Sequence, residues 1–155
     1  MTSDFYAKLA AVRRRIHAHP EISENEFETT AFLKEYISKL GIRILETDLP
    51  TGFIAEIGHG KPVIALRADI DALPIKEKNT FDYASQNGAM HACGHDFHQI
   101  SLLGAAEILK AKEEQLKGTV RLIFQPAEEV SVGAYQVIEN GGLKDVSAII
   151  GYHNY

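Results

Sequence analysis

The stretch PVIALRA, residues 62–68, is an apolar run of strand length, and two acidic residues, Asp69 and Asp71, follow it directly. A run of this kind suits a strand whose two faces are both buried, as in a sheet covered by helices. A second such run, GTVRLIF, covers residues 118–124. Both runs predict buried strands of one sheet.

Helical and strand patterns alternate on either side of these runs. Helices are expected over residues 5–16, 25–40, 97–112 and 132–140, and strands over residues 42–49, 52–57 and 146–152. Residues 69–90 show no clear period, and loops this long inside compact domains are usually functional or disordered. Strands alternating with helices indicate an α/β fold with a mostly parallel central sheet flanked by helices.

The composition limits the classes of partner. The 155 residues are 45% hydrophobic and 24% charged, as in an ordinary globular domain with a core. The formal net charge of −5 argues against a nucleic-acid partner. No apolar run approaches the roughly 20 residues of a membrane helix. With a single cysteine and no secretory pattern in residues 1–15, a cytoplasmic location is the default expectation.

Residue types that bind metals gather at four places along the chain. These places are Asp69 with Asp71, Cys93 with His95, Glu128 with Glu129, and His153. Three of the four lie just past the carboxyl ends of predicted strands, which is the edge where open α/β sheets bind ligands. If the strands are parallel, residues that are far apart in sequence meet there.

The chemistry of these residues suits a metal ion. Cys93 and His95 lie two apart, and in an extended backbone their side chains would point the same way and chelate one cation. Thiolate, imidazole and carboxylate together suit Zn²⁺ best, with Mn²⁺, Co²⁺ and Ni²⁺ as alternatives. The adjacent Glu128 and Glu129 suit a division of labour, in which one binds metal and the other takes a proton from water.

Each feature alone also has an ordinary structural explanation, so the joint pattern carries the metal hypothesis. A lone cysteine is usually a small buried apolar residue, and adjacent glutamates are usually solvated. His17 and His19, near a helix end, need only a dipole or packing role and are not assigned to metal. His59 is expected to be exposed in its turn. His91 and His98 either stand behind the ligands or face solvent.

Five segments together make the chain resemble a known family. They are RRRIHAHPEIS (13–23), ALRADIDALPI (65–75), MHACGHDFH (90–98), LIFQPAEE (122–129) and IIGYHN (149–154). They resemble the zinc aminoacylase/carboxypeptidase-type amidohydrolases, above all the branch of hippurate hydrolases, N-acetyldiaminopimelate deacetylases and plant auxin-conjugate amidohydrolases. The resemblance implies a zinc-peptidase-like catalytic domain and metal-dependent hydrolysis of the amide bond of a small N-acyl amino acid.

The resemblance further implies two divalent metal ions in one site. Cys93 would bridge them, in the place of an aspartate used by other branches. His95 and His153 would complete one metal, and Glu129 would bind the other.

The remaining roles also come from the resemblance. Glu128 would be the general base that activates water and passes the proton to the leaving amine. Other branches carry His-x-Asp where this chain has Asp69 and Asp71, and His95 would replace the missing histidine. Asp71 would orient a ligand from behind it, and the role of Asp69 beside the ligands stays open.

Family members also have an inserted lid domain and a further metal-binding histidine, and the chain ends before both. Residues 1–155 would then be the N-terminal portion of the catalytic domain, and the parent protein would be a homodimer or larger through its lid. Three alternatives stay open. They are a metallo-carboxypeptidase or dipeptidase of the same family, a catalytically inactive fragment, and a thiol enzyme that uses Cys93 with a histidine base.

Overall fold

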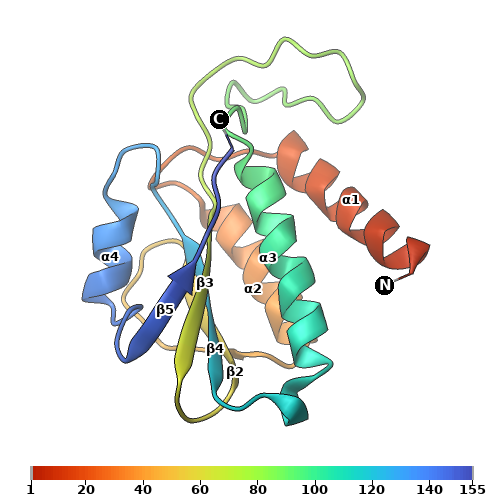
Figure 1. Ribbon diagram of the computed structural model, residues 1–155. Helices are drawn as coiled ribbons and strands as arrows, with labels where there is room; N and C mark the ends of the chain where they lie inside the picture. Colours follow the sequence, from red (N-terminus) through yellow and green to blue (C-terminus); the bar gives the residue numbers. More distant parts are fainter. Residues whose placement is uncertain (1, 155) are drawn as a thin grey trace.

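The computed structural model describes residues 2–154 and contains a central five-stranded sheet (Figure 1). The strands are β1 (Arg43–Ile44), β2 (Phe53–Gly58), β3 (Val63–Asp69), β4 (Thr119–Gln125) and β5 (Val146–Ile150), in the order β1-β2-β4-β3-β5. β3 pairs in parallel with β4 and β5, whereas β2 is antiparallel to both of its neighbours. The predicted mostly parallel α/β sheet is confirmed, with β2 running against the other four strands.

Helices cover both faces of this sheet. The helices α1 (Ser3–Ala18), α2 (Phe27–Lys39) and α3 (His95–Lys110) lie on one side, and α4 (Gly133–Glu139) lies on the other (Figure 1). A short 3₁₀ helix, η1 (Glu113–Gln115), precedes β4. Helix α1 packs mainly on α3, so it forms an outer layer. Within residues 2–154, no helix is both long and apolar enough to cross a membrane.

The strand predictions were too long in two places. Residues 42–49 were expected to form one strand, but only Arg43 and Ile44 pair, with Glu56 and Ala55 of β2. The last strand ends at Ile150 and not at residue 152. Apolar residues mark which segments are buried, but a strand continues only as far as its neighbour offers hydrogen-bond partners.

The main core lies between the sheet and helices α1, α2 and α3. The rings of Phe53 on β2 and Phe124 on β4 are stacked, with 4.5 Å between their centroids. Leu33 of α2 and Leu103 of α3 are both fully buried in the same cluster. Removing such apolar surface from water stabilises the fold by about 25 cal/mol for each Å². This packing holds the start of α3 close to the ends of β3 and β4.

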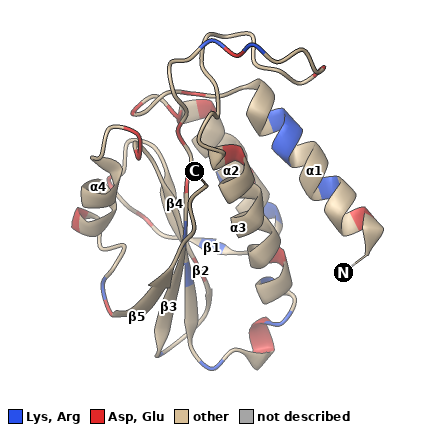
Figure 2. Ribbon diagram, turned by 45° about the horizontal axis from the view of Figure 1, so that its top comes forward, with Lys and Arg blue, Asp and Glu red and all other residues tan. Residues whose placement is uncertain are grey.

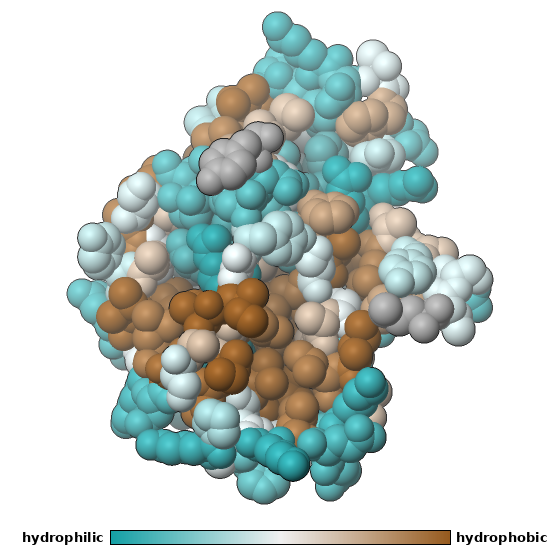
Figure 3. Space-filling view, viewed as in Figure 1, coloured by the Kyte–Doolittle hydropathy of each residue, from teal (hydrophilic) through white to brown (hydrophobic). Residues whose placement is uncertain are grey.

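The strand β5 forms one edge of the sheet and exposes apolar side chains. Ile149 and Ile150 are 49% and 62% exposed, and an apolar area covers the face around them (Figure 3). Exposed apolar edge strands are places where further polypeptide adds to a sheet.

Truncating Leu103 to alanine tests the packing of α3. Because this side chain is fully buried, Leu103→Ala should lower the free energy of unfolding by about 2–5 kcal/mol, measured by urea denaturation. Ile138→Ala on α4 is the control, since Ile138 is 51% exposed and its loss should change stability by no more than about 0.5 kcal/mol. Equal losses for the two variants would contradict the described core.

Candidate metal centre

The four groups of ligand-type residues meet at the carboxyl ends of the parallel strands. Asp69 ends β3, Glu128 and Glu129 follow β4, and His153 follows β5. His95 begins α3 and points to the same edge, which lies beside the chain's C-terminal end (Figure 1). Acidic residues of several segments lie around the start of α3 (Figure 2).

His95 stands at the centre of this cluster and is only 1% exposed. Its Nε2 atom lies 3.2 Å from His153 Nε2, 3.6 Å from Glu128 Oε2, and 3.7 Å from both Asp69 Oδ2 and Glu129 Oε1. Side chains that follow or end three strands thus converge on one atom of the first residue of α3.

The side chains form two groups in which the ligand atoms lie within 4.8 Å of one another. The first group holds Cys93, His95 and Glu129, and the second holds Asp69, His95, Glu128 and His153. The two groups share His95. The resemblance had allotted Glu129 and His95 to different metals, whereas the structure places Glu129 with His95 and Cys93. It also brings Asp69 to the ligand atoms.

Cys93 and His95 converge through a glycine, not through an extended backbone as expected. Cys93 lies in a turn, and Gly94 caps α3 in the left-handed conformation with a φ of 79°. Glycine adopts this conformation without steric cost. The turn therefore directs the thiol and the first side chain of the helix toward the same place, which the strand-like interpretation of this pair did not foresee.

The donor set fits a divalent transition-metal ion. One thiol, two imidazoles and several carboxylates combine the ligands that Zn²⁺ and its neighbours prefer. In the metal-free protein, a hydrogen bond to Glu129, burial and the nearby carboxylates raise the pKa of Cys93 to about 12. A cation would offset this concentration of negative charge and would favour the thiolate.

Asp71 contacts the cluster from behind. Its carbonyl oxygen accepts a hydrogen bond from His95 Nδ1 at 2.8 Å, so Nδ1 carries a proton and Nε2 faces the cluster. The carboxylate of Asp71 accepts hydrogen bonds from Ser23 Oγ at 2.6 Å and from the Glu129 amide at 3.0 Å. Burial acts to raise the pKa of Asp71, but the hydrogen bonds from His95, Ser23 and Glu129 outweigh it and lower this pKa.

Glu26 supports the turn that carries the two glutamates, and the sequence offered no signal for this role. Its side chain is fully buried at the start of α2. One carboxylate oxygen accepts the Ala127 amide at 2.8 Å, and the other accepts Thr51 Oγ1 at 2.7 Å. Ala127 has a φ of 47°, and it directly precedes Glu128. Glu26 thus stabilises an unusual backbone conformation beside the cluster.

His17 lies inside the protein and not at an exposed helix end. It is 4% exposed, with Nδ1 at 2.9 Å from Asp96 Oδ2 and Nε2 at 3.0 Å from Glu77 Oε1. Arg13 also pairs with Asp96 at 2.9 Å. The hydrogen bond to Asp96 and, to a lesser extent, the contact with Glu77 raise the pKa of His17 despite its burial. His17 therefore joins α1 to the start of α3 and to the loop after β3.

The remaining histidines differ in whether they are exposed or buried. His59 is exposed, as expected from its turn. His91 and His98 are both buried, which excludes the solvent-facing alternative. Burial lowers the pKa of His91 to about 4, so this side chain is neutral. His19 lines a cavity that is separate from the cluster.

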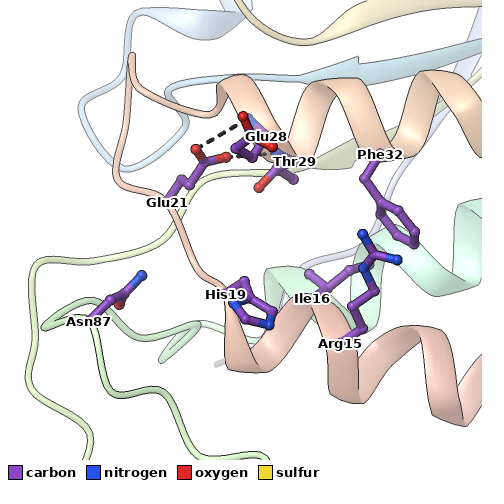
Figure 4. Close-up of a pocket in the computed structure, with 8 residues that line it drawn as sticks. All are labelled: Arg15, Ile16, His19, Glu21, Glu28, Thr29, Phe32 and Asn87. Atoms are coloured by element: carbon purple, nitrogen blue, oxygen red, sulfur yellow. Dashed lines mark hydrogen bonds between the residues drawn. The ribbon is translucent and has the colours of Figure 1, made fainter.

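That cavity, of about 550 Å³, lies between the end of α1 and the start of α2 (Figure 4). Its walls include Arg15, His19 and Phe32, and they contain none of the predicted metal ligands. Glu21 points to the first turn of α2, where its carboxylate accepts amide hydrogen bonds from Glu28 and Thr29 (Figure 4). The cavity is therefore separate from the candidate metal ligands.

The fold and the ligand cluster define an α/β domain with a candidate metal centre at the carboxyl edge of its parallel strands. The chain belongs to peptidase family M20/M25/M40, whose family model matches residues 65–155. The family resemblance found in the sequence is thereby confirmed.

Several relatives match almost the whole chain. N-acetyl-L-cysteine deacetylase of Bacillus subtilis is 55% identical over 95% of the chain and 36% of its own length. IAA-amino acid hydrolase ILR1-like 5 of Arabidopsis thaliana is 47% identical over 97% of the chain and 35% of its own length. The crystal structure of the Bacillus subtilis YXEP protein, described as a dinuclear metal binding peptidase from the M20 family, matches with a TM-score of 0.95 and 50% identity. The match covers 99% of this chain and 44% of the chain in that crystal structure.

The pKa of His17 predicts a pH-dependent contribution to stability. Because folding raises this pKa, the contribution is complete below the unfolded value of about 6.5 and is lost as pH rises through the folded value. The stability difference between the wild type and His17→Gln, measured by urea denaturation, should be largest near about pH 6 and should shrink toward about pH 9. A stability difference between the wild type and His17→Gln that stayed constant with pH would contradict the raised pKa of His17.

Proposed function

We propose that this chain provides the dinuclear metal site of an amidohydrolase that cleaves the amide bond of N-acyl amino acids. The observation that carries the proposal is the convergence of Cys93, His95, Glu129, Glu128 and His153 within a few ångströms at one sheet edge. The deacetylase and amino acid hydrolase relatives support amide chemistry on small N-acyl substrates. The M20 peptidase of Bacillus subtilis supports two metals.

The proposed ligands are side chains of the described cluster. Cys93 would bridge the two metals, as the family resemblance implies, and His95, Glu129 and His153 would be further ligands from the two groups that share His95. Zn²⁺ is the ion that this mixture suits best, with Mn²⁺, Co²⁺ and Ni²⁺ as competitors. When bound, the metals supply Lewis acidity that activates water and stabilises negative charge on the amide oxygen. Asp71 orients the His95 ring, because its carbonyl oxygen holds the Nδ1 proton.

Glu128 is proposed as the general base. Its side chain is 30% exposed, against 15% for Glu129, so it is the glutamate that more readily meets a substrate. Its Oε2 atom lies 3.6 Å from His95 Nε2 and 3.8 Å from His153 Nε2, at the mouth of the cluster. There Glu128 takes a proton from the attacking water and delivers it to the amine nitrogen as the amide bond breaks.

The proposal for the whole protein extends past the described residues, since the chain spans only 35% to 44% of the lengths of these relatives. We propose that residues 1–155 form the N-terminal portion of the catalytic domain, and that a lid domain and further ligands come from additional polypeptide. A homodimer through that lid and a cytoplasmic location belong to the same proposal. A reducing compartment suits the thiol of Cys93, because it prevents oxidation to a disulfide.

Cobalt binding tests the metal site in the chain itself. Because Cys93 is the only cysteine, a thiolate-to-cobalt charge-transfer band on adding Co²⁺ reports that residue alone. The purified wild type should develop this band, a chelator should remove it, and Cys93→Ser should lack it. A wild type that binds Co²⁺ without the band would contradict Cys93 as a ligand.

A chimaera tests the activity. These residues would replace the 55% identical segment of the Bacillus subtilis N-acetyl-L-cysteine deacetylase. The chimaera should hydrolyse N-acetylcysteine, and Glu128→Gln should lower kcat by about 10²–10⁴-fold while metal content stays unchanged. Exposed Glu114→Gln is the matched control and should keep full activity. An active Glu128→Gln chimaera would exclude this base, and a metal-loaded chimaera that cleaves only dipeptides would exclude the proposed substrate class.

A further inference from the structure

His98 uses both of its ring nitrogens in contacts beside the metal cluster. It lies in the first turns of α3 and is 1% exposed. Its Nδ1 atom is 2.6 Å from Asp69 Oδ1, and its Nε2 atom is 3.2 Å from the backbone nitrogen of Asn154. The ring therefore connects the end of β3 with the segment that follows β5.

The partners determine where the proton of His98 lies. The amide of Asn154 can only donate, so Nε2 must accept and cannot carry a proton. Nδ1 then carries the single proton and donates it to the Asp69 carboxylate. The geometry thus requires a neutral ring with a donor on one side and an acceptor on the other.

The two hydrogen-bond partners of His98, Asp69 and Asn154, both lie at the metal cluster or next to it in sequence. Asn154 directly follows His153, whose ring centroid is 5.2 Å from that of His98. Asp69 presents its other oxygen, Oδ2, at 4.0 Å from His153 Nε2, and Arg67 donates to this oxygen at 2.7 Å. A movement of the His98 ring would therefore shift the backbone that carries His153.

The segment after β5 is held closely against α3 by other contacts as well. A Cβ atom on Gly94 would lie 2.8 Å from Asn154 Nδ2, so the Asn154 side chain comes close to the backbone at the start of α3. The hydroxyl of Tyr152 contacts Ser101, and the Tyr152 ring packs on His98 with 5.0 Å between centroids. Within this arrangement, His98 contacts both residues that flank His153, the ring of Tyr152 and the backbone amide of Asn154.

We propose that His98 is a positioning residue for His153, because its Nε2 atom accepts the Asn154 amide and so holds the His153 backbone at the cluster. The inference rests on the proposed metal site. It goes further, because it gives His98, which is not a proposed ligand, the role of placing the ligand His153. Supporting contacts of this kind typically change metal affinity by about 10–100-fold.

Two substitutions separate the two nitrogens of the ring. An asparagine amide occupies roughly the place of Nδ1, so His98→Asn keeps a donor for Asp69 and loses the acceptor for Asn154. A glutamine amide reaches roughly the place of Nε2, so His98→Gln keeps an acceptor for Asn154. His153→Ala is the reference for complete loss of the ligand.

The experiment is a Co²⁺ titration of the purified chain and its variants, followed by the thiolate band and by the visible cobalt spectrum. The His153→Ala variant identifies the cobalt binding that depends on His153. His98→Asn should weaken this binding by about tenfold or more, while the Cys93 band persists. His98→Gln should retain most of that binding. In the His153→Ala background, His98→Asn should cause no further loss, because the two residues act through one ligand.

Several outcomes would overturn the inference. One is that His98→Asn binds Co²⁺ as tightly as the wild type. Another is that His98→Asn and His98→Gln lose equal cobalt affinity. A third is that His98→Asn loses the Cys93 band. Wild-type binding no stronger than that of His153→Ala would also overturn it. Nitrogen NMR of the wild type tests the geometry without any variant, since a charged or Nε2-protonated His98 would be incompatible with it. A wild type without a thiolate band would instead contradict the proposed function itself.

Discussion

The parallel pairing of β3 with β4 and β5 is the constraint on which the site depends. In a parallel sheet, the carboxyl ends of neighbouring strands lie at one edge, so the residues that follow them meet. Asp69, Glu128 and His153 are separated by up to 84 residues, yet they surround the same histidine nitrogen. Had one of these strands run the other way, its polar residues would lie at the opposite end of the sheet.

Gathering this many carboxylates and imidazoles in a buried place has an electrostatic cost, and the surrounding contacts show how the fold accommodates it. Each buried acid at the cluster has fixed partners: Asp71 accepts from Ser23 and the Glu129 amide, and Asp69 pairs with Arg67 and His98. Unpaired charges in such surroundings would be strongly destabilising. A hydrogen bond to Glu129, burial and the nearby carboxylates raise the pKa of Cys93, and a divalent cation would favour the thiolate instead.

Local sequence patterns predicted where most helices and strands lie, but not which strands pair, in which direction, or which distant residues contact one another. The apolar runs around Leu66 and Leu122 predicted buried strands of one sheet, and in the structure these two strands pair, with Leu66 opposite Leu122. The antiparallel direction of β2 and the two-residue length of β1 could not be predicted, because hydrogen bonds to a distant strand decide both. The same holds for Glu26, since a glutamate at the start of a helix gives no sign that its carboxylate is buried against Ala127.

The sequence by itself determined the chemical types available and their positions after strands, because apolar periodicity and ligand-type residues are local properties. It thereby indicated the sheet edge, the family and the residues Cys93, His95, Glu128, Glu129 and His153. Only the tertiary structure decided how these residues group around His95 and that Gly94, not an extended backbone, joins the thiol to the imidazole. It also decided that His17 and His98 are buried supports. Burial and hydrogen-bond partners arise from contacts between distant segments, and no local pattern records them.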